Sequence, residues 1–433
     1  MINKDENHGR SPQQIRITPQ IMLKEKPTMP ILTKLSIKGF KSIWQDTLDL
    51  GQLNVFIGTN GAGKSNLLEA IAVMSASLEG GIDYDRLQKR GARLSSSAIF
   101  RSAFKNKNRT SSFNLSAELG NLSYSMDVNA DGGFRYLAES VKMSGKTVAG
   151  RSNNGATVDK VSLKSKLDNT KGIFPYLQAY KTINVKQEAQ DILEPLESLI
   201  NYAIYAPATP LLRGVEVDSS TKEPLGIYGG RLADALYETI KSDIDIDELK
   251  RFFKLLNWFK SFGTTTESDP ELLSGQMDIV GRKVWYEDRF MRKNFNKLYA
   301  YDVSEGALYI LFLLTLLTNK RSPNMFALDN IDTALNPGLV RNLMSHIVQI
   351  LKSKPEKQIF LTTHNPTTLD AVDLFDPTHR LFVVERDKDG HTKSRRIVPP
   401  PGMTKAEWEQ KYFGMKLSEI WLSGAIEGLP TGF

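Results

Sequence analysis

Gly58-Thr59-Asn60-Gly61-Ala62-Gly63-Lys64-Ser65 is the stretch of sequence that decides the fold, because it matches the phosphate-binding pattern GxxxxGK followed by Ser or Thr. The apolar segment LNVFI precedes it and the amphipathic segment NLLEAIAVMSASL follows it, which predicts a strand, a glycine-rich loop and a helix. Glycines in such a loop let backbone N–H groups face phosphate oxygens, and the start of the helix adds partial positive charge. The stretch predicts nucleotide binding; the alternative is a glycine-rich turn without a ligand.

Phosphate chemistry needs a cation, a hydroxyl and an acid, and the sequence offers all three. Lys64 is expected to reach the β- and γ-phosphates, and the Ser65 hydroxyl to bind Mg²⁺. A second magnesium partner is normally an acid at the end of a neighbouring apolar strand, and the segment MFALD supplies Asp329. Asn66 directly follows the loop and is also expected at the nucleotide. In the alternative, Asp329 only caps a turn.

These motifs, with others downstream, resemble the ABC-type ATPases of the SMC, RecF and OLD group. The resemblance covers residues 32–109 and residues 286–433, while the middle of the chain matches only loosely. It implies ATP and Mg²⁺ as cofactors, and an α/β head with a mixed or parallel sheet core, an antiparallel β subdomain and a helical insertion. Within the group, the chain looks like the compact ATPases that serve as subunits of bacterial antiphage defence systems.

The segment Asp302-Val303-Ser304-Glu305-Gly306-Ala307 resembles the signature element of this family. In the family, that element reaches from one protomer to the ATP of the other. The resemblance therefore implies that Ser304 and Gly306 hydrogen-bond the γ-phosphate in a partner copy.

Residues 329–336, DNIDTALN, resemble the family's acid strand end and D-loop, with one departure. The glutamate that orients the attacking water is replaced by Asn330. An amide can hold a water but cannot accept its proton, so hydrolysis is expected to be slow. Asp332 is a candidate substitute, and a structural role for Asp332 in the D-loop is the alternative. Asn336 likewise takes the place of the D-loop aspartate.

Two further segments resemble elements that border the nucleotide in the family. QIFLTTH ends in His364, which matches the switch histidine that reports the γ-phosphate. Phe40-Lys41-Ser42 resembles the segment beside the nucleotide, so Lys41 is expected there. The candidates for the family's Q-loop residue are Gln88, Arg90 and Arg93.

Composition favours a cytoplasmic protein. The 433 residues carry a net charge of +7, which is too modest to indicate nucleic acid by itself. There is no cysteine, so disulfides and cysteine-based sites are excluded. The polar first 30 residues predict a flexible tail, with no signal peptide. The most apolar run, ALYILFLLTLL, is shorter than the roughly 20 residues that cross a bilayer and predicts a buried helix; a membrane is not indicated.

Hydrophobic periodicity divides the chain into four parts. After the tail at 1–30, residues 31–161 are expected to form an N-terminal lobe with the phosphate loop and antiparallel strands. Residues 162–280 are expected to form a helical insertion. Residues 281–433 are expected to form a C-terminal lobe with the signature segment, the acid strand and His364. Alternating strands and helices there predict parallel strands in an α/β fold.

An ABC-type head binds ATP between two copies, so the resemblance implies a homodimer or a higher homo-oligomer. The ending KLSEIWLSGAIEGLP looks like that of one half of a two-component defence system, which implies a separate effector protein, TOPRIM-like or another nuclease. The residues after His364 are too few for a TOPRIM domain.

Two alternatives stay open. One is a RecF-like DNA-repair ATPase that holds nucleic acid with the basic residues of segment 86–109 and with Lys393, Arg395 and Arg396. The ordinary explanation for such charge runs is a solvated surface. The other alternative is a nucleotide-gated scaffold with negligible turnover, which the replacement at Asn330 favours.

Overall fold

The computed structural model describes most of the chain after residue 30. The described residues are 31–152, 154–163, 167–184, 186–218, 220, 222–242, 255–272 and 281–426. The tail expected over residues 1–30 lies outside them, and so does the very end of the expected C-terminal lobe, residues 427–433.

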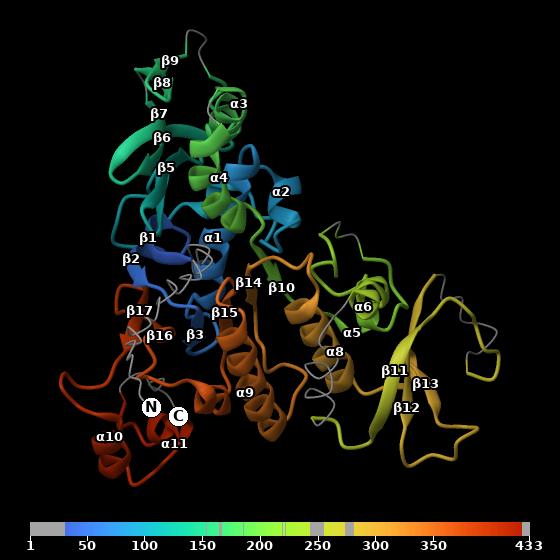
Figure 1. The fold of residues 1–433 in the computed structure, drawn as a ribbon. Helices are drawn as coiled ribbons and strands as arrows, with labels where there is room; N and C mark the ends of the chain where they lie inside the picture. Colours follow the sequence, from blue (N-terminus) through green and yellow to red (C-terminus); the bar gives the residue numbers. More distant parts are fainter. Residues whose placement is uncertain are drawn as a thin grey trace, which may run out of the picture.

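A six-stranded sheet lies at the centre of the molecule (Figure 1). Its strands, in the order β10-β14-β15-β3-β16-β17, span Ala203–Tyr205, Met325–Leu328, Gln358–Thr363, Leu53–Ile57, His379–Arg386 and Thr392–Ile397. All neighbours pair in parallel except β16 and β17. This order brings the C-terminal ends of β14, β15 and β3 side by side, which is where open α/β sheets hold ligands.

The central sheet separates two hydrophobic cores. On β14, Ala327 faces the core around helix α1 (Lys64–Glu79), whereas Phe326 and Leu328 face the core around α8 (Glu305–Thr318) and α9 (Pro337–Ser353). Successive side chains of a strand point to opposite faces of the sheet, and both faces are covered here. All residues of such a strand are therefore buried. The expected buried helix is confirmed, because the run ALYILFLLTLL lies in α8 with every residue buried.

An eight-stranded antiparallel sheet forms a second layer, in the order β2-β1-β4-β5-β6-β7-β8-β9. These strands span Ile43–Asp49, Leu32–Phe40, Ser112–Leu119, Leu122–Asn129, Arg135–Met143, Lys146–Ser152, Gly155–Val158 and Val161–Ser162. The antiparallel strands predicted within residues 31–161 are confirmed; among them, the segments SSFNLSAEL, LSYSMDV and FRYLAESVKM form β4, β5 and β6. One face of this sheet packs into the same core as α1.

The segment expected to be a helical insertion contains both helices and strands. Its described helices are α3 (Phe174–Asn184), α4 (Lys186–Ile200), α5 (Thr209–Leu212) and α6 (Leu232–Lys241). Two stretches that were expected to be helical are strands. The buried AIY of β10 joins the central sheet, and FKSF begins β11 (Phe259–Thr265), which pairs with β12 (Lys283–Asp288) and, through it, β13 (Lys297–Tyr299). A short apolar run fits both the helical period of 3.6 residues and the strand period of two, so pairing within a sheet decides its conformation here.

Short helices complete the chain. They are α2 (Tyr84–Gln88), α10 (Lys405–Lys411), α11 (Leu417–Leu422) and the 3₁₀ helices η1 (Ser97–Phe100), η2 (Ala300–Asp302) and η3 (Pro366–Ala371). Among the residues that the structure describes, no helix is long and apolar enough to cross a membrane.

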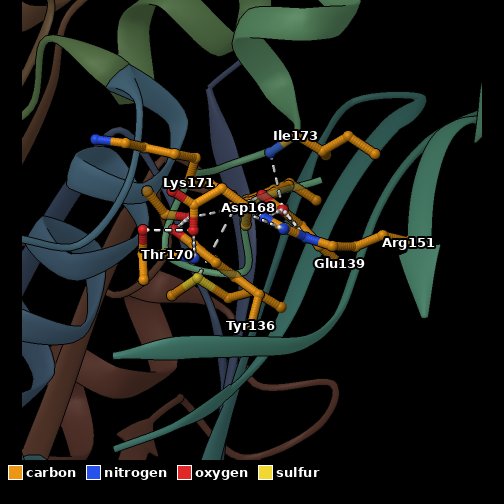
Figure 2. A network of polar contacts seen from close by, with 10 residues as sticks. Tyr136, Glu139, Arg151, Asp168, Thr170, Lys171 and Ile173 are labelled. Carbon is orange, nitrogen blue, oxygen red and sulfur yellow. Dashed lines mark hydrogen bonds and ion pairs between the residues drawn. The ribbon is translucent and has the colours of Figure 1, made fainter. Parts of the chain in front are cut away.

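A buried polar network ties the eight-stranded sheet to the C-terminal end of α1. Figure 2 shows Glu139, on β6, meeting the Arg151 guanidinium at 2.8 Å and the Ile173 N–H at 2.9 Å. The second carboxylate oxygen of Glu139 accepts a hydrogen bond from the Tyr124 hydroxyl at 2.7 Å, and that hydroxyl lies 2.5 Å from Ser77 Oγ on α1. Burial raises the pKa of Glu139, although Arg151 opposes the shift. Both carboxylate oxygens are bonded, so this network is closed.

Candidate nucleotide-binding site

The phosphate loop connects β3 to α1 and turns through two glycines in the left-handed backbone region. Gly61 and Gly63 have φ values of 79° and 108°, which glycine adopts without a Cβ clash. A Cβ at Gly63 would lie 2.1 Å from the Thr392 hydroxyl oxygen, and one at Gly58 would lie 2.1 Å from the Val384 carbonyl oxygen. The hairpin of β16 and β17 therefore packs directly against the loop.

The same hairpin hydrogen-bonds the loop. Thr392 Oγ1 donates to the Ala62 carbonyl at 2.7 Å, and Arg386 Nε donates to the Gly61 carbonyl at 3.1 Å. The loop tip, Thr59-Asn60-Gly61, is exposed. Sequence reasoning missed Arg386 and Thr392, because no motif marks this hairpin and both residues lie more than 300 positions from the loop.

Lys64 is the first residue of α1, and its ammonium lies inside the loop. The Nζ atom donates to the Gly58 carbonyl at 2.7 Å and to the Thr59 carbonyl at 3.0 Å. Burial lowers the pKa of Lys64, and the carboxylates of Asp329 and Asp332 oppose this shift. The cation is thus placed next to both acids and within the curve of the loop.

Asp329 lies at the C-terminal end of β14, against the first turn of α1. The Ser65 hydroxyl donates to Asp329 Oδ2 at 2.9 Å. Thr362, on β15, donates to Asp329 Oδ1 and accepts the Asn330 N–H at 2.8 Å. Carboxylate and hydroxyl oxygens are the donors that Mg²⁺ prefers, so Ser65 and Asp329 form a donor set that fits the metal. Sequence reasoning missed Thr362, although its strand was recognised.

The backbone after Asp329 gives a local reason for asparagine at position 330. Asn330 has a φ of 56°, in the left-handed region where asparagine is enriched among residues other than glycine. A glutamate would adopt this conformation less readily. Asn336 also has a local role, because its side chain accepts the Leu339 N–H at 3.0 Å and caps the start of α9.

Asp332 and His364 form a pair beside the phosphate loop. The Asp332 side chain is 4% exposed, and its Oδ2 lies 3.6 Å from His364 Nε2. The other oxygen, Oδ1, has no hydrogen-bond partner within the described part of the chain. His364 follows β15 and is about half exposed, at 48% of its side chain. A buried carboxylate oxygen with unused capacity can accept a proton or a water.

Lys41 is directed at α1 through an ion pair. Its ammonium contacts Glu69 and lies 4.5 Å from the centre of the Phe100 ring, and the Lys41 side chain is 6% exposed. Burial lowers the pKa of Lys41, and Glu69 opposes the shift. Burial disfavours ionised Glu69, but Arg93 and Lys41 outweigh burial and hold the pKa of Glu69 below its usual range. Next to Lys41, the Ser42 hydroxyl accepts a hydrogen bond from the Asn66 amide at 2.6 Å.

Of the candidates for the Q-loop position, Arg93 lies at the first turns of α1. Its guanidinium donates to Asn66 Oδ1 at 2.5 Å and to Glu69 Oε1 at 2.7 Å, and the hydrogen bond to Glu69 raises the pKa of Arg93. Arg90 points elsewhere, to Ser75 at 2.5 Å, and Gln88 lies on the exposed side of α2. The geometry favours Arg93.

Ser304 and Gly306 lie at the start of α8. Ser304 is exposed at the N-cap position, and its side chain makes no capping hydrogen bond. Gly306 packs against the D-loop, because a Cβ there would lie 3.2 Å from the Ala334 carbonyl oxygen. The N-terminus of α8 therefore presents a hydroxyl and backbone N–H groups to the outside.

The basic run at 86–109 is largely engaged within the chain. Arg86 contacts Asp83, Arg93 pairs with Glu69, and Arg90 meets Glu79 at 2.6 Å. Further along the run, Arg101 pairs with Asp131 at 3.1 Å, Lys107 lies 4.0 Å from the centre of the Trp44 ring, and Arg109 donates to the Ala98 carbonyl at 2.6 Å. These contacts show that many of the basic side chains in the run have partners within the chain.

Comparison with known proteins places this site in a family. Residues 53–370 match the family described as AAA domain, putative AbiEii toxin, Type IV TA system, and this match covers most of the chain. The chain belongs to this AAA family. The AAA domain of this chain spans β3 to η3, so it contains the phosphate loop, the acid strand and His364. No curated relative of similar sequence was found.

SMC heads are among the solved structures that this chain resembles. The SMC head bound to the C-winged helix domain of ScpA is 15% identical; the match covers 86% of this chain and 100% of that one, with a TM-score of 0.52. The SMC head domain from Thermotoga maritima is 14% identical over 85% of this chain and 99% of that one, with a TM-score of 0.44. The first of these comparisons shows that the expected α/β head fold is correct.

Proposed function

We propose that this protein is a Mg²⁺-dependent ATPase that closes around two ATP molecules as a homodimer and thereby controls a separate effector in bacterial antiphage defence. The observation that carries the nucleotide part is the 2.9 Å contact between Ser65 and Asp329, two residues 264 positions apart in the chain. A hydroxyl and the Lys64 ammonium after β3, and a carboxylate after β14, lie at the C-terminal edge of one parallel sheet, on either side of β15. These are the parts that phosphoryl-transfer sites share.

In this proposal, the loop from Gly58 to Gly63 holds the phosphates with backbone N–H groups, and α1 adds its N-terminal charge. When the nucleotide binds, the Lys64 ammonium gives up its hydrogen bonds to the carbonyls of Gly58 and Thr59 and donates to phosphate oxygens instead. Ser65 and Asp329 hold Mg²⁺, which, when bound, neutralises charge on the β- and γ-phosphates. Thr362 keeps the Asp329 carboxylate turned toward Ser65.

Water activation falls to the pair formed by Asp332 and His364. Asn330 cannot accept a proton, whereas Asp332 is nearly buried and has a carboxylate oxygen without a hydrogen-bond partner among the described residues. His364 lies against the other oxygen of that carboxylate, as an orienting partner does. His364 also serves as the donor that distinguishes ATP from ADP. Turnover is expected to be slow, because a carboxylate at position 330 is missing.

Dimerisation follows from the exposed start of α8. Ser304, Gly306 and the helix N-terminus form an anion-binding surface that points away from their own chain. A second copy that places this surface on the γ-phosphate would complete the site. Because Gly306 contacts the D-loop, binding of the γ-phosphate at the start of α8 would also affect residues 329–336 of the same copy.

Support for a separate partner protein comes from the SMC head that was solved bound to the C-winged helix domain of ScpA. The family description mentions a putative toxin of a Type IV TA system, which is the reason for proposing a role in defence. We propose that the cytoplasmic effector is TOPRIM-like or another nuclease.

The experiment is to measure the molecular mass in solution and the ATP turnover of the wild type, Lys64→Ala and Asn330→Glu. We expect the wild type to dimerise only with ATP and Mg²⁺, and Lys64→Ala to stay monomeric without turnover. A wild-type chain that stays monomeric at saturating ATP and Mg²⁺ would contradict the proposal. Turnover no faster than that of Lys64→Ala would favour a scaffold.

A further inference from the structure

A polar cavity of about 570 Å³ lies at the other end of α1 from the phosphate loop. Helix α1 has 16 residues, so about 24 Å of helix separates the two sites. The cavity is bounded by the last residue of α1, the end of α2, the end of α4 and the segment that leads into β14. It therefore lies near the N-terminal ends of β10 and β14, away from the edge that carries Asp329.

Basic side chains outnumber acidic ones around this cavity. The charged residues that line it are Lys89, Arg90, Lys222, Lys320 and Arg321, with Glu79, Glu197 and Glu223. Arg90 pairs with Glu79 at 2.6 Å, and Arg321 pairs with Glu223. Among the lining residues, three lysines then face a single remaining carboxylate, that of Glu197. The balance of charge favours an anion.

Lys222 is a partly buried cation whose hydrogen-bond partner is neutral. Its ammonium donates to the Asn201 carbonyl at 2.9 Å, which is a neutral partner. Burial lowers the pKa of Lys222 to about 8, and the positive charges of Arg90 and Lys89 act in the same direction, with Glu79 opposing them. Like charges that converge in a partly buried site cost free energy, and an anion among them removes that cost.

A second polar group in the wall of this cavity has no partner. Ser322, in the segment before β14, is 6% exposed, and its hydroxyl has no hydrogen-bond partner among the described residues. Buried hydroxyls in folded proteins are nearly always bonded. The hydroxyl is closed off from solvent, and a rotation of the side chain into the cavity would let it donate to a phosphate oxygen.

We infer that the cavity is a second anion site, which binds a small phosphate-bearing molecule with two or more negative charges between Lys222, Lys89 and Lys320. Inorganic pyrophosphate and the phosphate chain of a nucleotide share this chemistry. Arg90 forms a fixed part of the wall, because its side chain is 4% exposed and held by Ser75, Glu79 and the Ile200 carbonyl. This inference does not depend on the proposed function.

The site has a direct connection to the phosphate loop. Residues 89–93 run from the cavity to the first turns of α1, with Lys89 and Arg90 at one end and Arg93 on Asn66 and Glu69 at the other. An anion that pulls Lys89 inward therefore acts on the segment that also positions Arg93.

The test is a calorimetric titration of inorganic pyrophosphate into the full chain carrying Lys64→Ala, at pH 8, in two buffers that differ in ionisation enthalpy. We expect saturable binding with uptake of a fraction of a proton, because Lys222 is only partly protonated near pH 8 and becomes fully protonated beside the anion. Lys222→Met in the same background should weaken binding at least tenfold and abolish the uptake. Lys222→Arg should keep the affinity and lose the uptake.

Lys146→Met is the matched control, because Lys146 is an exposed lysine on β7, outside the cavity lining. It should leave the titration unchanged. Absence of saturable binding, or equal affinity in Lys222→Met, would overturn the inference. Neither result would contradict the proposed ATPase function, which is tested separately by the ATP turnover of the wild type. A parallel titration with ADP identifies the source of the phosphate. If Lys222 increases the affinity for ADP more than the affinity for pyrophosphate, the natural ligand is a nucleotide; the reverse result indicates an inorganic anion.

Discussion

Two buried carboxylate clusters lie at opposite ends of α1, and they differ in how completely their oxygens are bonded. At the C-terminal end, both oxygens of Glu139 have donors, one of them the Arg151 guanidinium. At the N-terminal end, hydroxyl groups bond Asp329, and Asp332 Oδ1 has no hydrogen-bond partner among the described residues. A closed network stabilises the fold, whereas an open one is kept for a ligand or for chemistry. Substitutions should therefore cost stability at one end and activity at the other.

The largest effect is expected from Arg151→Ala. This change leaves the Glu139 carboxylate buried without its cation, which should lower the free energy of unfolding by about 3–5 kcal/mol. Chemical denaturation measures the loss. Arg135→Ala, on the neighbouring strand but exposed, is the control and should cost less than about 0.5 kcal/mol. A loss below about 1 kcal/mol in Arg151→Ala would mean that the closed network contributes little to stability.

Asp329→Asn should show the opposite pattern. The amide oxygen can still accept from Thr362 and the amide N–H group can donate to the Ser65 oxygen, so the free energy of unfolding should change by less than about 1 kcal/mol. Loss of the charge that holds the metal should reduce ATP turnover by about 100-fold, which corresponds to about 2.7 kcal/mol. Steady-state phosphate release at saturating Mg²⁺ measures this, with Glu118→Gln, at an exposed position on β4, as the control. Turnover near the wild-type value would remove Asp329 from the site.

Asp332→Asn tests the open oxygen itself. Neutralising a buried carboxylate that is only half satisfied should leave stability unchanged or raise it by up to about 1 kcal/mol. Turnover should fall about tenfold, or about 1.4 kcal/mol, because the amide cannot accept a proton. Thermal unfolding and single-turnover hydrolysis, measured on the same sample, separate the two effects. Lower stability with normal turnover would indicate that Asp332 is a structural residue of the D-loop.

Ser77→Ala should give the smallest effect. Ser77 Oγ lies 2.5 Å from the hydroxyls of Tyr124 and Tyr136, so its removal leaves two buried hydroxyls with one partner fewer. We expect a loss of about 1 kcal/mol in the free energy of unfolding and an unchanged affinity for ATP. Ser125→Ala, on a less buried pair of hydroxyls in the same sheet, is the comparison and should cost less. Equal losses of unfolding free energy in Ser77→Ala and Ser125→Ala would show that burial does not determine the cost of removing these hydroxyls.

The sequence predicted those parts of the fold and site that depend on short-range pattern. The phosphate loop lies between a strand and a helix that periodicity identifies, and the apolar MFALD has the length of a buried strand. Residues 203–205 were assigned to a helix because three apolar residues have no period of their own, and pairing with β14 decides their conformation. The partners of the loop, Thr392 and Arg386, depend on pairing between distant segments, which no local pattern encodes.

Side-chain placement was the hardest part to predict. Lys41 was expected at the nucleotide, but its ion pair with Glu69 on α1 could not be foreseen, because an internal helix glutamate looks like any solvated acid in sequence. The same holds for the left-handed backbone at Asn330, where the residue type alone suggested only a missing catalytic acid. Whether Lys41 contacts the nucleotide stays a prediction.

The contact between Thr392 and Ala62 joins residues 330 positions apart. During synthesis the chain grows from its N-terminus, so the phosphate loop leaves the ribosome long before the hairpin that braces it. A nascent chain should remain unable to hold ATP until β17 has emerged and paired with β16. Competence to bind the nucleotide is therefore acquired only after the segment that ends at Ile397 has been synthesised.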